Sequence, residues 1–288
     1  MTDLLHAFAL PRLNVRGAAV RLSDGFQQIL SHQPYPPSVR TWLGEALCAA
    51  TLLITGLKFQ GRLSVQLQGG AELALLYVEC SSNGDCRGIA RIAEGASPQE
   101  FEVATRGAAM AVTLEPLQGE RYQGIVELQG ATLAECFENY FARSEQLPTR
   151  MLLCADDAQA AGLMVQKLPE SGGIGSIDRD GWNRCEHLVS TVDPLEMLSI
   201  SSEQLLHRLF HQEERFDRTP LPLHIRCRCS RDKVSDVLRR IGRDEAIAAA
   251  REPGGAQITC EFCGKVYRFD AIEIEGLFRP IAPGAGRA

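Results

Sequence analysis

The sequence predicts an α+β protein with a mixed N-terminal core, a helical linker and a small C-terminal module that carries four cysteines. Apolar residues follow a helical period over residues 36–58 and then alternate strictly over 61–68. A glycine-rich stretch, "SGGIGS", interrupts the chain at 171–176, and the pairs CxC and CxxC lie close to the C-terminus. The expected parts are a core domain at 1–172, a linker at 173–220, a cysteine module at 221–272 and a disordered tail at 273–288.

The core domain combines helices and strands in a definite order. Helices are expected at 23–30, which begins with Ser and Asp, and at 36–58, where prolines occupy the first turn. Another helix follows the capping pair Thr132 and Glu135. The expected strands are 61–68, 71–80, 87–92, 108–114, 121–128, 149–156 and 162–169. The sequence contains no phosphate loop, Gly-x-Ser-x-Gly or paired-carboxylate motif, so this domain is expected to be a scaffold.

The linker is predicted to form three short amphipathic helices within 178–192, 193–200 and 201–216. Such helices are marginal in water unless another surface covers their apolar faces. We expect these faces to hold the linker in place and, when released, to contact client proteins. The residues assigned to this role are Trp182, Leu188, Leu205, Leu206, Leu209 and Phe210.

Composition favours a cytoplasmic protein. The net charge is −6, the longest apolar run (46–57) is too short to cross a bilayer, and the N-terminus does not resemble a signal peptide. Stable disulfides are rare in that compartment. Six of the ten cysteines lack metal-ligand spacing and are expected to be small buried hydrophobes. These six are Cys48, Cys80, Cys86, Cys136, Cys154 and Cys185.

The remaining four cysteines have the spacing of a zinc site. A CxxC turn brings two sulfurs together, and residues i and i+2 of a strand point to the same face. Polar neighbours such as Arg226, Arg228 and Glu261 argue against a simple hydrophobic core. His224 is expected at the surface. We therefore predict Zn²⁺ ligation by Cys227, Cys229, Cys260 and Cys263.

Three functions are compatible with this zinc module. A nucleic-acid-binding ribbon is disfavoured because 221–270 has ten Lys/Arg against seven Asp/Glu and four thiolates on Zn²⁺ subtract two charges. A thiol–disulfide oxidoreductase would use CxxC at a helix start. The third function is a redox switch. Nearby Arg and Lys favour thiolates, and oxidation of the cysteines releases zinc and removes about 10–16 kcal/mol of metal-binding free energy. The module then melts, the linker loses support, and exposed apolar surface binds unfolding proteins.

Several stretches resemble the redox-regulated bacterial heat-shock holdase family, the thirty-three-kilodalton chaperonin. They are "LKFQGRLSVQLQGG", "GERYQGIVEL", "YFARSEQLPTR" and the CxC and CxxC pairs, in that order. The resemblance implies a core of packed sheets and a zinc-bound, inactive monomer when reduced. It further implies an oxidised dimer with Cys227–Cys229 and Cys260–Cys263 disulfides, no zinc and an unfolded linker. Such a dimer would hold unfolding proteins without ATP and would not be an enzyme. Cys185 departs from the family pattern and is expected to be a buried small residue.

Overall fold

The computed structural model describes residues 3–56, 60–169, 178, 180–252 and 254–279. The chain divides into two compact units, Met1–Arg226 and Cys227–Ala288, and each is described by itself. The second unit begins at Cys227 rather than at the expected 221, because residues 221–225 pair with strands of the first unit. The glycine-rich break at 171–176 lies outside the described residues.

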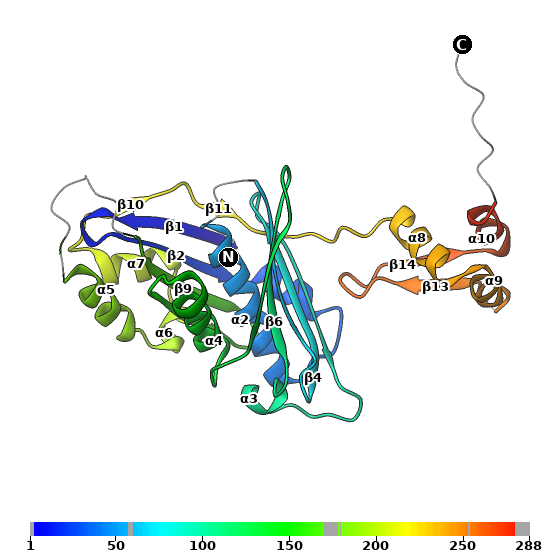
Figure 1. Ribbon diagram of the computed structural model, residues 1–288, viewed down its shortest axis with the longest axis horizontal. Helices are drawn as coiled ribbons and strands as arrows, with labels where there is room; N and C mark the ends of the chain where they lie inside the picture. Colours follow the sequence, from blue (N-terminus) through cyan, green and yellow to red (C-terminus); the bar gives the residue numbers. More distant parts are fainter. Residues whose placement is uncertain (1–2, 57–59, 170–177, 179, 253, 280–288) are drawn as a thin grey trace, which may run out of the picture. The chain divides into compact units, whose positions relative to one another are not determined.

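Two β-sheets form the framework of the first unit (Figure 1). The first sheet has the order β10-β1-β2-β9-β8, with β11 also paired to β1, and all its pairings are antiparallel. The second has the order β12-β5-β4-β3-β6-β7, and only β12 pairs in parallel. The strands of the first sheet are β1 (Leu4–Leu10), β2 (Val15–Leu22), β8 (Thr149–Ala155), β9 (Ala160–Lys167), β10 (Phe216–Asp217) and β11 (Leu221–Pro222). Those of the second are β3 (Gly61–Gln68), β4 (Leu73–Ser81), β5 (Asp85–Ile92), β6 (Ala109–Pro116), β7 (Tyr122–Glu127) and β12 (His224–Ile225).

Helix α2 (Pro37–Ile54) packs against both sheets. Its sequence is apolar on nearly every side, and Leu43, Leu47 and Leu52 are fully buried. These side chains join one hydrophobic core with residues from both sheets. The other helices of this core are α1 (Asp24–Leu30), α3 (Phe101–Ala104) and α4 (Leu133–Tyr140). The predicted fold class and the predicted core elements from residue 23 onward are therefore confirmed.

Strands β1 and β2 were not predicted from the sequence. Neither "LLHAFAL" nor "VRGAAVRL" alternates strictly between apolar and polar residues. The reason is that the first sheet is covered on both faces: Val15 and Ala19 face one hydrophobic cluster, whereas Ala18 and Val20 face the other. Such two-sided burial removes the period that identifies a strand.

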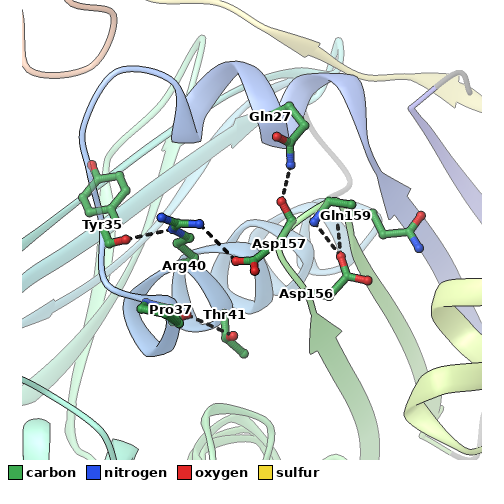
Figure 2. Close-up of polar contacts among 9 residues, drawn as sticks. Gln27, Tyr35, Pro37, Arg40, Thr41, Asp156, Asp157 and Gln159 are labelled. Atoms are coloured by element: carbon green, nitrogen blue, oxygen red, sulfur yellow. Dashed lines mark hydrogen bonds and ion pairs between the residues drawn. The ribbon is translucent and has the colours of Figure 1, made fainter.

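Polar contacts fix the turn between β8 and β9 to the helices beside it (Figure 2). Arg40 on α2 donates to the carbonyl of Tyr35 at 2.8 Å and pairs with the Asp157 carboxylate at 3.1 Å. Gln27 on α1 donates to the Asp157 carbonyl at 2.6 Å, and Asp156 accepts the backbone N–H of Gln159 at 2.8 Å. The turn is thus held in one conformation.

The second unit is a small assembly around its own hydrophobic cluster. It contains α8 (Arg231–Ile241), α9 (Arg243–Arg251), the hairpin β13 (Ala256–Thr259) and β14 (Val266–Phe269), and α10 (Ala271–Leu277). Tyr267 and Phe269 are buried in this cluster. The expectation of a disordered tail from residue 273 is wrong where α10 forms. Asp270 and Glu273 form a capping box at its start, and Ile274 is fully buried. Residues 280–288 of that tail lie outside the described residues.

Candidate metal centre and the linker interface

The structure brings the four cysteines of the second unit together. The sulfurs of Cys227, Cys229, Cys260 and Cys263 all lie within 4.8 Å of one another. Each CxC sulfur lies next to a CxxC sulfur: the Cys227 sulfur is 3.5 Å from that of Cys260, and the Cys229 sulfur is 3.5 Å from that of Cys263. Among the described residues of the chain, these four form the one group of His, Cys, Asp and Glu side chains arranged to hold a metal ion.

Local backbone structure places each pair. The CxC segment is followed by Ser230, whose hydroxyl accepts the N–H of Lys233 and begins α8. CxxC forms the turn between β13 and β14, where the N–H groups of Cys263 and Gly264 donate to the carbonyl of Cys260. Gly264 has φ +66°, a conformation that favours glycine. A CxxC in a hairpin turn differs from the helix-start CxxC of thiol–disulfide oxidoreductases.

The donor set fits a tetrahedral metal ion. Metal–sulfur bonds of about 2.3 Å in a tetrahedron require sulfur–sulfur edges of about 3.8 Å. The separations of 3.5 Å, with a largest value of 4.8 Å, lie close to this geometry. Four thiolates select Zn²⁺ or an iron–sulfur cluster over hard cations, which prefer oxygen ligands.

Tyr267 contacts one of the four sulfurs, a role that sequence analysis did not predict. Its hydroxyl donates to the sulfur of Cys229 at 3.1 Å. Burial opposes ionisation of Cys229, but hydrogen bonds from Tyr267 and from the other three cysteines lower its pKa to about 7. The alternation of strand β14, which places Tyr267 and Phe269 on one face, was the available signal.

Two other cysteines of the cluster, Cys227 and Cys263, resist ionisation. Burial raises the pKa of Cys227 to about 12, and burial also raises the pKa of Cys263. Two nearby cations contact aromatic rings: the Arg231 guanidinium stacks on Phe269 at 4.2 Å, and Lys265 lies over the Tyr267 ring at 5.1 Å. Four thiolates at this spacing therefore need a bound cation to balance their charge.

The linker covers the outer face of the first sheet (Figure 1). Its helices are α5 (Gly181–Ser190), α6 (Pro194–Ser199) and α7 (Ser202–Phe210). The rings of Phe210 and Phe8 lie 5.4 Å apart. Of the residues expected to hold the linker in place, Leu205, Leu206 and Phe210 are buried in this interface. Trp182, Leu188 and Leu209 are half-buried at its margin. Cys185 is fully buried here, as expected.

Polar groups that sequence analysis missed complete this interface. The guanidinium of Arg21 on β2 donates to the carbonyls of Leu198, at 2.7 Å, and Ile200. Gln159, the last residue of the turn between β8 and β9, also donates to the Leu198 carbonyl, at 2.6 Å. These bonds satisfy carbonyls at the α6 C-terminus that would otherwise lack helical partners.

Residues 216–226, which we call the connector, join the linker to the second unit's first cysteine. β10 and β11 pair with β1, and β12 then pairs with β5 of the other sheet. Arg226, whose N–H donates to the Cys86 carbonyl at 3.0 Å, is the residue before Cys227. His224 is exposed, as expected. Two-residue strands gave no readable signal in the sequence.

The comparisons with known proteins agree with this architecture. The family model described as "Hsp33 protein" matches residues 3–270. The chain belongs to the Hsp33 family. Relatives in this family named "33 kDa chaperonin" include those of Ectopseudomonas mendocina, 42% identical with 96% of each chain covered, and Azotobacter vinelandii, 42% identical with 99% of this chain and 98% of the relative covered.

A solved structure of an Hsp33 homologue shows the same fold. The crystal structure of the 33 kDa chaperonin from Thermotoga maritima superposes with a TM-score of 0.82 at 19% identity, covering 96% of this chain and 98% of that one. Within the part of this Hsp33 family member that the structure describes, no helix is long and apolar enough to span a bilayer.

Proposed function

We propose that the protein is a redox-regulated, ATP-independent chaperone of the cytoplasm that holds unfolding proteins and catalyses no reaction. One observation carries this proposal: a short-helix linker buries its apolar face on an apolar face of the core sheet. Removing the linker uncovers both surfaces at once. The core side of this interface includes Phe8, Leu10, Leu13, Val15 and Leu163.

The four clustered cysteines are proposed to hold Zn²⁺ in the reduced state. A bound ion would supply about 10–16 kcal/mol of folding free energy to such a small unit. The described part of this unit buries one modest cluster, with Leu238, Tyr267, Phe269 and Ile274 at its centre. Its stability is therefore expected to depend on its four ligands.

Oxidation is proposed to pair Cys227 with Cys229 and Cys260 with Cys263. Proximity does not favour these pairs, because the sulfurs of the cross-pairs Cys227–Cys260 and Cys229–Cys263 are 3.5 Å apart. Loop closure does favour them once the unit loosens: a loop roughly ten times shorter is cheaper to close by about 2 kcal/mol. Both disulfides consume metal ligands, so the unit loses its main stabilisation.

The connector is the proposed route from this unit to the linker. A Cys227–Cys229 disulfide needs Cβ atoms about 3.8 Å apart, much closer than in extended backbone. The chain next to Arg226 must therefore bend, which weakens the pairing of β12. Without the connector, the linker keeps only its own packing on the first sheet, and we expect it to unfold, expose apolar surface and allow homodimers to replace the reduced monomer.

A client-aggregation assay tests the proposal. The full-length protein, reduced and zinc-loaded or treated with peroxide at mildly raised temperature, is added to a thermally unfolding client without nucleotide. Suppression by the oxidised protein alone, together with zinc release and loss of the free thiols of the four-cysteine cluster, is expected. Equal suppression by both forms, or suppression that requires ATP, would contradict it. Retention of zinc by a Cys-to-Ser variant at all four positions would contradict the ligand assignment.

A further inference from the structure

A second pair of cysteines lies deep in the first unit. Cys80 ends the buried part of β4, Cys86 begins that of β5, and the two residues face each other directly across the hairpin. Their sulfurs are 3.3 Å apart, and both residues are 1% exposed. The hydroxyl of Thr51 on α2 lies 3.9 Å from the Cys86 sulfur. This pair belongs to unit 1 and not to the four-cysteine cluster.

The backbone already has the geometry of a disulfide. Directly opposed residues of antiparallel strands have Cα atoms about 4.5–5.5 Å apart. Disulfides span about 4.4–6.8 Å between Cα atoms, so the sulfurs can bond without strand separation. The sulfurs of Cys80 and Cys86 also contact the backbone carbonyls of Ser81 and Gly84, each at 3.6 Å. Those of Cys136 and Cys154 contact the carbonyls of Gly130 at 3.8 Å and of Ala161 at 3.7 Å.

The connector covers this pair. Ile225 is the register partner of Cys86, and the N–H groups of His224 and Arg226 donate to the carbonyls of Gly84 and Cys86 at 2.9 and 3.0 Å. Pro222 packs so closely on the hairpin turn that a Cβ atom at Gly84 would lie 2.1 Å from its carbonyl oxygen. The Ile225 side chain also packs on the core cluster that contains both cysteines. Detachment of the connector would uncover the β5 edge at Cys86 and so open a path for an oxidant to the sulfurs.

We propose that Cys80 and Cys86 are a second redox site, which forms an intramolecular disulfide with a peroxide oxidant after the connector detaches from β5. One sulfur attacks the peroxide O–O bond, giving a sulfenic acid and one water. The second sulfur attacks the sulfenic sulfur, the S–S bond forms, the S–O bond breaks and a second water leaves. Two thiols and one hydrogen peroxide thus yield one disulfide and two waters.

The connector, which we call the gate of this site, also controls the reverse reaction. A reductant must also pass the connector, so the Cys80–Cys86 disulfide persists once β12 has paired with β5 again. The presence of the Cys80–Cys86 disulfide therefore shows that the connector had detached at an earlier time. The thiol pair and its gate follow from the contacts of the first unit alone, whereas the trigger that opens the gate in the native protein rests on the proposed function.

Trypsin provides a direct assay. The peptide 63–87, between Arg62 and Arg87, contains Cys80 and Cys86 and no other cysteine. Full-length zinc-loaded protein is treated with hydrogen peroxide, denatured in acid, alkylated and digested. The disulfide leaves this peptide unalkylated and two hydrogens lighter. Ile225→Asp opens the gate, and Thr219→Asp adds the same charge at an exposed connector position as a matched control.

The expected result is formation of this disulfide in oxidised wild-type protein after zinc release, and formation about tenfold or more faster in Ile225→Asp while the four-cysteine cluster is still reduced. Full alkylation of the peptide in both proteins would overturn the proposal. Equal rates of disulfide formation in wild type, Ile225→Asp and Thr219→Asp would contradict the role of the connector as a gate. Formation in Ile225→Asp but not in zinc-free wild type would support the site and its gate and contradict the trigger from the proposed function.

Discussion

At the scale of single residues, the ten cysteines fall into two environments. Six are buried in the first unit, and the four of the second unit are partly exposed. Burial raises the pKa of Cys154 and of Cys185 to about 12, and burial also raises the pKa of Cys48 well above its ordinary value. Because the thiolate is the nucleophile, these buried thiols are unreactive at neutral pH while the fold is closed.

The first prediction concerns Cys260→Ser. Loss of one of four sulfur ligands should weaken zinc binding by more than about 100-fold, since removal of an outer-shell partner alone costs about 10–100-fold. We expect partial chaperone activity without oxidant, measured by client aggregation beside zinc content. Cys136→Ser, which removes a buried core sulfur, is the control. A Cys260→Ser protein that stays folded, zinc-loaded and inactive under reducing conditions would contradict the coupling.

Tyr267→Phe tests the hydrogen bond at the cluster. Metal binding displaces thiol protons, so apparent affinity falls as pH falls. The Tyr267 hydroxyl helps to lower the pKa of Cys229 to about 7, and this lowering lets the sulfur release its proton at lower pH. The variant should therefore lose zinc at a higher pH than wild type in a chelator competition between about pH 6 and 8. Identical pH profiles would show that the hydrogen bond does not affect ligation.

At the scale of elements, the linker depends on the sheet it covers. Phe210→Asp would place a charge against Phe8, and even truncation of such a ring costs about 3–5 kcal/mol. We expect a lower peroxide threshold for activity and faster hydrogen exchange over 181–210. Leu209→Asp should act more weakly because Leu209 is half-buried. Leu195→Asp, 74% exposed on α6, is the control, and a threshold equal to that of Phe210→Asp would argue against docking through α7.

Periodicity predicted the elements that have one polar and one apolar side. β3, with its regular alternation, and α7, with the capping box of Ser201 and Gln204, lie where the sequence placed them. β2 was missed because both of its faces are buried. β9 belongs to the same sheet and is buried without interruption from Ala160 to Gln166, which implies a cover on each face. The linker is that second cover.

Long-range pairing could not be predicted in the same way. Cys227, Cys229, Cys260 and Cys263 were identifiable because ligand spacing is local. The surface that receives the linker is contributed by strands far away in the sequence, such as β1 and β9. Arg21 and Gln159 bind backbone carbonyls of the linker, and a carbonyl has no sequence signature. The two-residue strands of the connector are equally invisible to periodicity.

At the scale of the whole molecule, the linker helices, the connector and the first metal ligand follow one another along the chain. Residues 181–210 cover the first sheet, the connector closes the edges of both sheets, and the next residue is Cys227. No flexible residues separate the last paired position, Arg226, from the first ligand. We therefore expect a distortion at Cys227 and Cys229 to act on the pairing of β12, because no intervening chain would absorb it.

Insertion of about six Gly/Ser residues between Arg226 and Cys227 tests this continuity, because such a linker behaves as a flexible coil. Peroxide should still release zinc and form the cluster disulfides, since the ligands are unchanged. The connector should stay paired, so the linker should remain protected in hydrogen exchange and the gain in chaperone activity should fall. A matched insertion after Thr219, in the exposed part of the connector, leaves the junction at Cys227 intact. Full oxidative activation of the Arg226 insertion variant would show that the signal reaches the linker by another route.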